Sequence, residues 1–250
     1  MKQESNYNND SIIQITNLKK SFGKNIVLLD FTLNVKQGEN VVVIGKSGSG
    51  KSVLIKCIIG LMRPDSGTIN VFGEDVSKRS HAELDEMRAK VGFLFQSNAL
   101  YDSMTIRENL EFPLRRHWIK NTKENITDLV KEALSNVGLI ETLNLKPDEL
   151  SGGMKKRIAL ARTLILKPKI ILYDEPTSGL DPITGKEISN LIVEVQKKYS
   201  ASSIIISHDM NCAKIASNKI AMLIDGTCYA TGTYEEMKKS VDEKIKQFFD

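Results

Sequence analysis

The sequence has 250 residues, 41% hydrophobic and 26% charged, which is ordinary for a globular protein and enough for one large domain or two packed lobes. A net charge of +4, from 35 basic and 31 acidic residues scattered along the chain, gives no reason to expect a nucleic-acid partner. Because the sequence contains no run of about 18 apolar residues, it predicts no segment that spans a membrane.

The first eleven residues, MKQESNYNNDS, are polar and lack an apolar core. We therefore expect residues 1–11 to form a flexible tail rather than a signal peptide, with the folded domain over 12–250. The three cysteines are isolated from one another and from any metal-binding spacing. They are typical of reduced, mostly buried thiols in a cytosolic protein, not of a disulfide framework or zinc site.

Extended and helical patterns alternate in the first hundred residues. Ser80 and Glu83 have the spacing of a capping box, which opens a short helix ending near residue 90. The predicted strands are 12–16, 26–35, 41–44, 67–75 and 91–95, and a buried helix is expected over 53–62.

Helical periodicity replaces extended runs from residue 97 to about residue 167. This change predicts a helical lobe inserted into an α/β core. Its expected helices cover residues 105–116, 122–139 and 151–166.

The core pattern then resumes with a continuous apolar strand over 169–174, of the kind found in parallel sheets. Thr233 and Glu236 form a capping box for one final helix. The other expected elements are a helix over 185–199, a strand over 202–207 and a hairpin of 220–225 with 227–232. Strands that alternate with helices predict an α/β fold with a mainly parallel sheet.

The stretch VVVIGKSGSGKS has the spacing of a phosphate-binding loop, and it lies between a predicted strand and a predicted helix as that motif requires. Its glycines let successive backbone N–H groups point at an anion, and the positive end of the following helix adds to the field. Lys51 would reach the β- and γ-phosphates, and the Ser52 hydroxyl would hold Mg²⁺. The loop comprises Gly45, Lys46, Ser47, Gly48, Ser49, Gly50, Lys51 and Ser52.

Asp174 ends an apolar strand and Glu175 follows directly. A carboxylate at the end of a strand is by itself most often solvated. In a chain with a phosphate loop, however, Asp174 suits Mg²⁺, and Glu175 is placed to polarise water for attack on the γ-phosphate.

A second candidate anion site opens the helix that begins LSGGM. Ser151 is a natural N-cap, and the free N–H groups at Gly152 and Gly153 would attract an anion, although a plain helix cap is the alternative.

Three further residues are weak signals alone. His208 and Gln96 each stand at the end of a predicted strand, where ligands bind in parallel sheets, but a lone histidine there is more often structural. Phe22 lies upstream of the phosphate loop and would either stack on a nucleotide base or anchor a turn.

Together these residues resemble the ABC-type ATPases, the nucleotide-binding subunits of ABC transporters. The resemblance covers residues 12–249 and implies a P-loop NTPase core, N-terminal antiparallel strands and an inserted α-helical subdomain. The motifs stand in the family's order: GKSGSGKS as Walker A, Gln96 as the Q-loop, LSGGM as the signature, IILYDE as Walker B, the D-loop with Asp181, and His208 as the switch histidine.

The resemblance implies ATP and Mg²⁺ as cofactors and a head-to-tail homodimer. Each ATP would lie between one Walker A loop and the partner's Ser151, Gly152 and Gly153. It further implies that His208 touches the γ-phosphate and that Asp181 crosses the interface. Gln96 would link Mg²⁺ or water to the lobe that meets the membrane subunit, and Phe22 would stack on the base. The sequence departs from the family pattern at Met154, usually glutamine, and at Phe22, usually tyrosine.

Within the family, FQSNALYDSMTIRENLEFPLRRH is similar to the ATPases of Mla-type transport systems, which work with an MCE-domain protein and a membrane permease. This implies phospholipid as the cargo and a peripheral position on the cytoplasmic face of the inner membrane. On this view Leu114 and Arg115 contact the permease. The basic run Lys155–Arg157 fits a solvated helix face better than a site for lipid headgroups.

Two other functions stay open at this point. One is the ATPase of an importer for a small polar solute, and the other is a non-transport scaffold of the cell-division or iron–sulfur assembly type. The proteins that co-purify with the chain would distinguish them.

Overall fold

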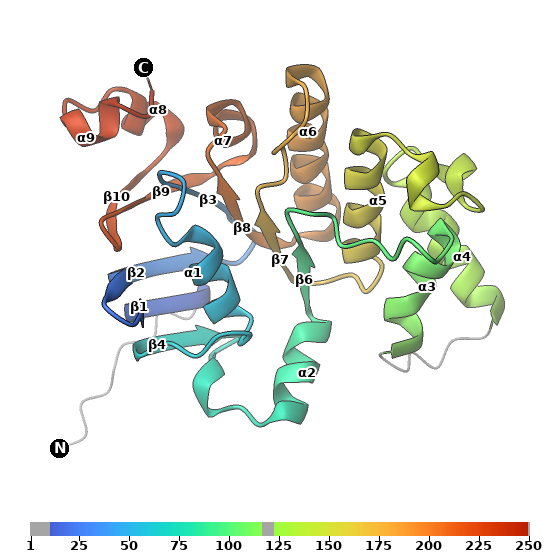
Figure 1. The fold of residues 1–250 in the computed structure, drawn as a ribbon, viewed down its shortest axis with the longest axis horizontal. Coiled ribbons are helices and arrows are strands. Elements are labelled where there is room, and N and C mark those ends of the chain that lie inside the picture. Colours follow the sequence, from blue (N-terminus) through green and yellow to red (C-terminus); the bar gives the residue numbers. More distant parts are fainter. Residues whose placement is uncertain (1–10, 117–122, 250) are drawn as a thin grey trace.

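A computed structural model describes residues 11–116 and 123–249, and in them one twisted sheet runs through the molecule (Figure 1). Its strands lie in the order β5-β4-β1-β2-β10-β9-β3-β8-β7-β6. The strands are β1 (Ser11–Phe22), β2 (Asn25–Lys36), β3 (Asn40–Ile44), β4 (Ser66–Val71), β5 (Glu74–Asp75), β6 (Val91–Leu94), β7 (Ile170–Asp174), β8 (Ser202–Ser207), β9 (Lys219–Ile224) and β10 (Thr227–Gly232).

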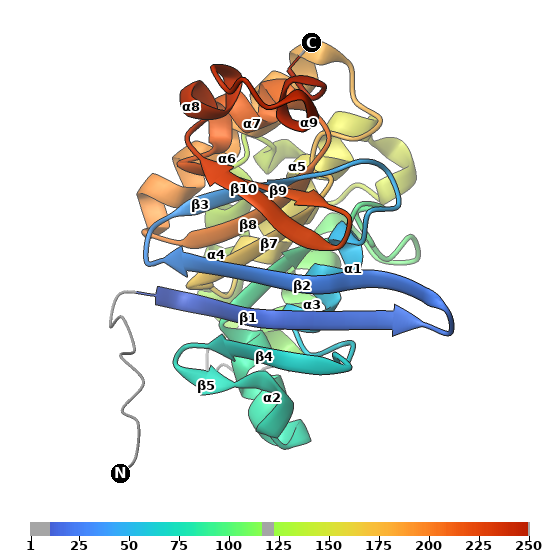
Figure 2. The same ribbon diagram turned by 90° about the vertical axis from the view of Figure 1, so that its left-hand side faces the viewer.

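The sheet has an antiparallel part and a parallel part, as the fold class predicts. Strands β1, β2, β4 and β5 pair antiparallel, and the β1–β2 hairpin extends well past its neighbours in Figure 2. Strands β9, β3, β8, β7 and β6 pair in parallel. The single Thr227–Asp30 pair of β10 with β2 joins the two parts.

Helices cover both faces of the parallel strands. The helices are α1 (Lys51–Ile58), α2 (His81–Ala89), α3 (Ile106–Arg116), α4 (Lys123–Ser135), α5 (Gly152–Leu164), α6 (Pro182–Tyr199), α7 (Met210–Ala216), α8 (Tyr234–Lys238) and α9 (Glu243–Lys246), with 3₁₀ turns at Val76–Lys78, Ile140–Thr142 and Pro147–Glu149. Figure 1 shows α1 beside the antiparallel strands, with α3, α4 and α5 gathered at the other end of the molecule.

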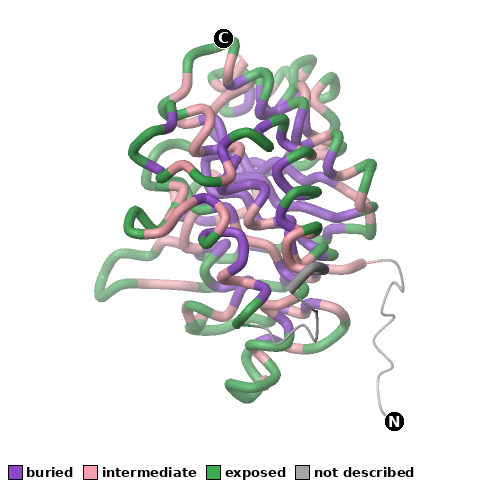
Figure 3. Tube along the Cα trace, turned by 90° about the vertical axis from the view of Figure 1, so that its right-hand side faces the viewer, coloured by how far each residue is buried: buried purple, intermediate pink, exposed green. Residues whose placement is uncertain are grey.

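Alternating side chains of the buried strands supply two hydrophobic clusters, one on each face of the sheet. In β7, Ile171 and Tyr173 belong to the cluster under α3 to α7, whereas Ile170 and Leu172 belong to the cluster with α1 and the antiparallel strands. Every residue of β7 and β8 is buried, which explains their continuous apolar sequences. Figure 3 shows the buried chain at the centre and the exposed residues around it.

Parallel pairing brings the carboxyl ends of β3, β8, β7 and β6 to one edge of the sheet. The loops that follow these strands carry the candidate site residues. Register pairs such as Ile44 with Ser207 and Asp174 with Ile206 place the strand ends level with one another. The fold therefore gathers residues that are more than a hundred positions apart in the sequence.

The elements differ from the sequence predictions mainly at the two ends of the chain. Strand β1 continues to Phe22 instead of stopping at residue 16, because register shifts let it keep pairing through a polar stretch. The expected final helix is two short helices, α8 and α9, because Asp242 caps a separate turn. Residues 1–10 of the expected tail lie outside the described residues, and Ser11 already belongs to β1.

Helices α3, α4 and α5 share one apolar core, to which Leu110, Leu134 and Ile158 contribute fully buried side chains. The division of the chain into an α/β core and a helical lobe over 97–167 stays a proposal. In the two described stretches, no helix is both long and apolar enough to span a membrane.

Candidate functional site

The loop between β3 and α1 forms a backbone cradle. Gly48 and Gly50 have φ angles of +77° and +102°, in the left-handed region that side chains disfavour. A Cβ at Gly50 would also lie 2.5 Å from Cγ1 of Val27, so β2 packs directly behind the loop. At this position both the backbone conformation and the close packing require glycine.

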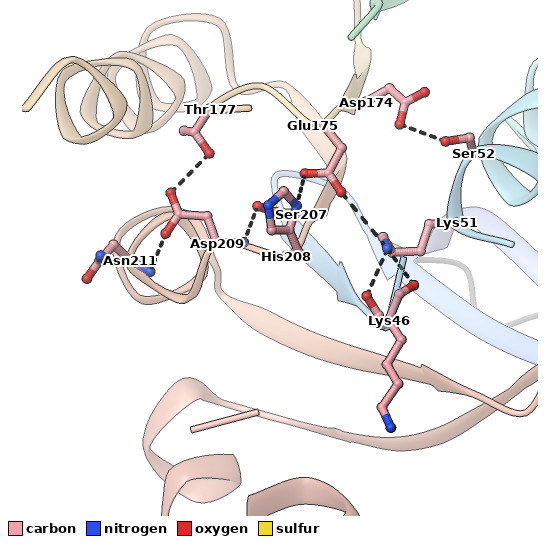
Figure 4. Close-up of polar contacts among 11 residues, drawn as sticks. Lys46, Lys51, Ser52, Asp174, Glu175, Thr177, Ser207, His208, Asp209 and Asn211 are labelled. Carbon is pink, nitrogen blue, oxygen red and sulfur yellow. Dashed lines mark hydrogen bonds and ion pairs between the residues drawn. The ribbon is translucent and has the colours of Figure 1, made fainter. Parts of the chain in front are cut away.

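Lys51 lies inside this cradle, only 7% exposed (Figure 4). Its Nζ donates to the carbonyl oxygens of Gly45 (2.8 Å) and Lys46 (3.1 Å), and it lies 3.9 Å from Oε1 of Glu175. Burial lowers the pKa of Lys51, while the charges of Glu175 and Asp174 act in the opposite direction. The loop thus holds a positive charge that faces the acidic strand end.

Ser52 and Asp174 meet at the start of α1. The Ser52 hydroxyl donates to Oδ1 of Asp174 across 3.0 Å, although 122 residues separate the two in the sequence. A hydroxyl beside a carboxylate is the oxygen donor set that Mg²⁺ uses when it keeps several waters and phosphate oxygens as its other ligands. The residues present therefore fit the cation expected from the sequence.

Glu175 follows β7 in a strained conformation, with a φ angle of +51° that a non-glycine residue rarely adopts. Its N–H donates to the Ile206 carbonyl of the adjacent strand, which fixes this conformation. The turn aims the carboxylate at His208, whose Nδ1 lies 2.8 Å from Oε2. Such stored backbone strain is typical of functional sites.

Two residues that the sequence analysis did not single out fasten the loops after β7 and β8 to each other. Asp209 accepts hydrogen bonds from the Thr177 hydroxyl (3.0 Å) and the Asn211 N–H (2.8 Å), and Figure 4 shows it beyond His208. Asp209 thus caps α7, a helix that the sequence analysis missed because it has only seven residues. The Asp–Asn spacing after His208 was its only signal.

The start of α5 lies apart from this cluster. Figure 1 shows α1 and α5 separated by β8, β7 and β6. Ser151 caps α5 as predicted, accepting from the Met154 N–H, and it lines an open groove of about 540 Å³ with Gly152, Gly153 and Asp181. None of the residues that line this groove belongs to the cradle with Lys51.

Asp181 has a structural role of its own in this groove. It caps α6 by accepting from the N–H groups of Ile183 (3.1 Å) and Thr184 (3.0 Å) and from the Thr184 hydroxyl. These hydrogen bonds, that of the hydroxyl first, lower the pKa of the Asp181 carboxyl, so it is ionised at the groove wall.

The basic run on α5 is not a solvated face, and that prediction was wrong for its central residue. Lys156 is 2% exposed, and its Nζ donates to the main-chain carbonyl of Gln96 across 2.8 Å. Arg157 forms an ion pair with Glu187 of α6. A pattern of charged letters could not reveal this, because the helix turns Lys156 inward between the lobe and the strand ends.

Gln96 and Phe22 both have exposed side chains at the edges of the site. Gln96 follows β6, level with Asp174 and Glu175 at the same edge of the sheet. Phe22 ends β1 on the projecting hairpin and is 48% exposed, with Lys20 Nζ 5.6 Å from its ring centroid.

A single family model, described as "ABC transporter", matches residues 28–178, which is more than half of the chain. The chain belongs to the ABC transporter family. Its fold is that of the ATP-hydrolysing domain of this family, with the cradle, Asp174 and Glu175 in one cluster. The signature at Ser151 lies within the matched range.

Three curated relatives carry different transport names. The chain is 42% identical to the "Probable ribonucleotide transport ATP-binding protein mkl" of Mycobacterium tuberculosis, over 94% of this chain and 66% of that protein. It is 36% identical to the "Methionine import ATP-binding protein MetN" of Campylobacter jejuni, over 95% of this chain and 75% of that one. It is also 36% identical to the "Intermembrane phospholipid transport system ATP-binding protein MlaF" of Haemophilus influenzae, over 96% of this chain and 90% of that protein. The chain spans slightly less than two thirds of the length of mkl.

Two solved structures share the fold. The ATP-binding cassette MJ0796, in a dimeric post-hydrolysis state with ADP and Pi, superposes with a TM-score of 0.81 at 32% identity, over 89% of this chain and 98% of that one. CbiO1 of Clostridium perfringens, part of the cbiONQ transporter complex, has a TM-score of 0.84 at 28% identity, over 95% of this chain and 93% of that one. These similarities confirm the expected fold class.

Proposed function

We propose that this chain is the ATP-hydrolysing subunit of a membrane transporter and that it moves phospholipid through a separate permease. The convergence of Lys51, Ser52, Asp174, Glu175 and His208 at one sheet edge carries the first half of the proposal. In this reading the cradle binds the phosphates, Ser52 and Asp174 hold Mg²⁺, and Glu175 accepts a proton from the attacking water. A bound Mg²⁺ would supply charge neutralisation at the phosphates.

His208 would orient Glu175 and then contact the γ-phosphate. Its ring is 66% exposed while the Glu175 side chain is 11% exposed, so the histidine faces the space where a nucleotide would enter. Gln96, at the end of β6, would reach Mg²⁺ or its water, and Phe22 on the projecting hairpin would stack on the base.

The hydrolytic unit is proposed to be a head-to-tail homodimer. The groove at Ser151, Gly152 and Gly153 presents free N–H groups but lies apart from the chain's own Lys51, so a second copy is needed to bring the two together. Asp181 lies in the same groove and would face the partner. The dimeric state of MJ0796 supports a unit of two copies.

Mixing two inactive variants tests the shared site. Lys51→Ala damages the cradle and Ser151→Glu places a negative charge where the γ-phosphate would lie. In a head-to-tail dimer a mixed pair contains one site with neither change. About half of the dimers would be mixed, so ATP hydrolysis in an equal mixture is expected to recover to roughly a quarter of the unmodified rate.

Each variant alone should hydrolyse ATP at background level. A chain that carries both substitutions serves as the control, because none of its dimers contains an intact site. If mixed dimers form, as judged by mass spectrometry with one copy labelled, and ATP hydrolysis in the mixture nevertheless stays at background level, the site is not shared between two chains.

The permease is proposed to dock in a groove between α2, β6 and α3. Leu114 cannot contact it as the sequence analysis expected, because its side chain is only 1% exposed and lies in the lobe core. Arg115 is 70% exposed and pairs with Glu111 one helical turn earlier, so its contact with the permease stays a prediction. The groove holds about 320 Å³ and is lined by aromatic rings and guanidinium groups, with Phe95, Tyr101, Phe112, Arg88, Arg116 and Arg162 among its lining residues.

Tyr101→Ala should weaken docking without changing nucleotide binding. Tyr101 is 42% exposed and packs at a tilt against Phe112 with ring centroids 5.0 Å apart, so it offers an aromatic anchor of the kind that dominates interfaces. We expect about a tenfold loss of the chain from permease-containing membranes, measured by sedimentation. Tyr229→Ala, equally exposed at 40% on β10, is the matched control and should remain bound. Equal loss with both variants would contradict docking in this groove.

The cargo is the finer part of the proposal. Among the three named relatives, MlaF aligns over the largest share of its own length. The segment from Phe95 to His117 also resembles the Mla-type ATPases, although residue 117 lies outside the described residues. These similarities support phospholipid transport with an MCE-domain protein as a partner, at the inner face of the cytoplasmic membrane.

Affinity purification from membranes tests the cargo class. A permease together with an MCE-domain protein would support lipid transport. A permease with a soluble solute-binding protein would favour the second candidate function, import of a small polar solute. The names of the relatives MetN and mkl support this candidate. Recovery without any permease would favour the scaffold function instead.

A further inference from the structure

Helix α5 carries two cations that point into the protein and bind the main chain after β6. Lys156 donates to the Gln96 carbonyl at 2.8 Å, and Arg162 donates to the carbonyls of Asn98 (2.9 Å) and Ala99 (2.8 Å). Three carbonyl groups within four residues are thus held by one helix. These contacts join the helical lobe to the loop that carries Gln96.

The loop so held is strained. Asn98 and Ala99 are consecutive residues with φ angles of +63° and +50°. Non-glycine residues rarely adopt this left-handed conformation, and two in succession persist only where the surroundings fix them. Oδ1 of Asn98 is also buried without a hydrogen-bond partner in the described structure. Without its anchors on α5 this segment would relax.

Lys156 is an unusual residue to use for such an anchor. Its ammonium is almost fully buried, no carboxylate of the described residues lies within ion-pairing distance, and its hydrogen bond goes to a neutral carbonyl. Burial lowers the pKa of Lys156, and the charges of Asp174 and Glu175, which lie beyond ion-pairing distance, act in the opposite direction, so burying this ammonium is costly. A glutamine or an apolar residue would be the simpler choice if only packing mattered, so a specific contact is indicated.

We propose that Lys156 is a positioning residue for ATP hydrolysis, which acts by fixing the main chain of Gln96 so that its side chain faces the Mg²⁺ site. The inference rests on the role proposed above for Gln96. Lys156 itself touches neither nucleotide nor metal. Arg162 fixes the next turn of the same loop, beside the groove that holds Tyr101.

Lys156→Met tests this role, because methionine retains the length of the stem and removes the donor. We expect the amides of residues 97–101 to exchange with deuterium about tenfold faster in the nucleotide-free protein, since the loop opens more often without its anchor. We also expect kcat for ATP to fall about tenfold, with the affinity for ATP in EDTA changed less than about twofold.

Lys155 is the neighbouring and less buried lysine, so Lys155→Met is the matched control. It should change neither the amide exchange of residues 97–101 nor kcat. Lys156→Arg should restore much of the protection because it keeps a cationic donor. An unchanged thermal unfolding midpoint in Lys156→Met separates a local effect from general destabilisation.

A double-mutant cycle with Gln96→Ala decides whether Lys156 acts through Gln96. In the Gln96→Ala background, Lys156→Met should cause no further loss of kcat. An equal tenfold loss in both backgrounds would overturn the inference, because Lys156 would then act on stability or on another group.

The cycle also separates this inference from the proposed function. If Gln96→Ala alone leaves hydrolysis unchanged, the role of Gln96 is wrong. If Gln96→Ala slows hydrolysis but Lys156→Met changes neither kcat nor amide exchange, only the role of Lys156 is wrong.

Discussion

Glu175→Gln is expected to reduce ATP hydrolysis by about 10²–10³-fold while nucleotide binding is retained. Glu175 is the only carboxylate among the described residues that lies within 4 Å of both Lys51 and His208. An amide of the same shape can accept the His208 hydrogen bond but cannot take a proton from water, and removal of a general base typically costs this much. Phosphate release measured at saturating ATP gives the effect.

The same variant should trap a dimer. With hydrolysis blocked, ATP stays between the cradle and the partner's signature, so gel filtration with ATP should show a dimer and without ATP a smaller species. Glu194→Gln, at an exposed acid on α6 that does not line the groove with Ser151, is the control and should behave as the unmodified chain. Only monomer with Glu175→Gln and ATP would argue against the shared site.

Lys51→Ala is expected to lower ATP affinity by roughly 10- to 100-fold. The ammonium of Lys51 already lies inside the cradle, so it needs little rearrangement to meet a phosphate. Hydrogen bonds to charged groups contribute about 1.5–3 kcal/mol, which corresponds to this range of affinities. Equilibrium binding of a fluorescent ATP analogue measures the change.

Lys46→Ala provides a control in the same loop. The Lys46 side chain is exposed and points away from Glu175 in Figure 4, so its loss should change affinity less than about threefold at physiological salt. If Lys46→Ala weakens binding as much as Lys51→Ala, the loss reflects the loop's net charge and not a specific phosphate contact.

Local patterns in the sequence determined most of the elements of this protein. The continuous burial of β7 and β8 agrees with their continuous apolar sequences, and the capping boxes at Ser80 and Thr233 begin helices where predicted. The cradle could be predicted from the sequence because its glycines allow the backbone conformation that a phosphate-binding loop requires. These features depend on residues that are neighbours in the chain, and therefore the local sequence is sufficient to predict them.

The tertiary structure decided what depends on distant contacts. Lys156 reads as a surface charge until the turn of α5 buries it against Gln96, and Leu114 reads as a docking residue until the lobe core encloses it. The length of β1 came from its pairing partners, and the Asp209 link needed the β7 and β8 loops side by side. Burial and pairing are properties of packed elements, and therefore no local pattern could specify them.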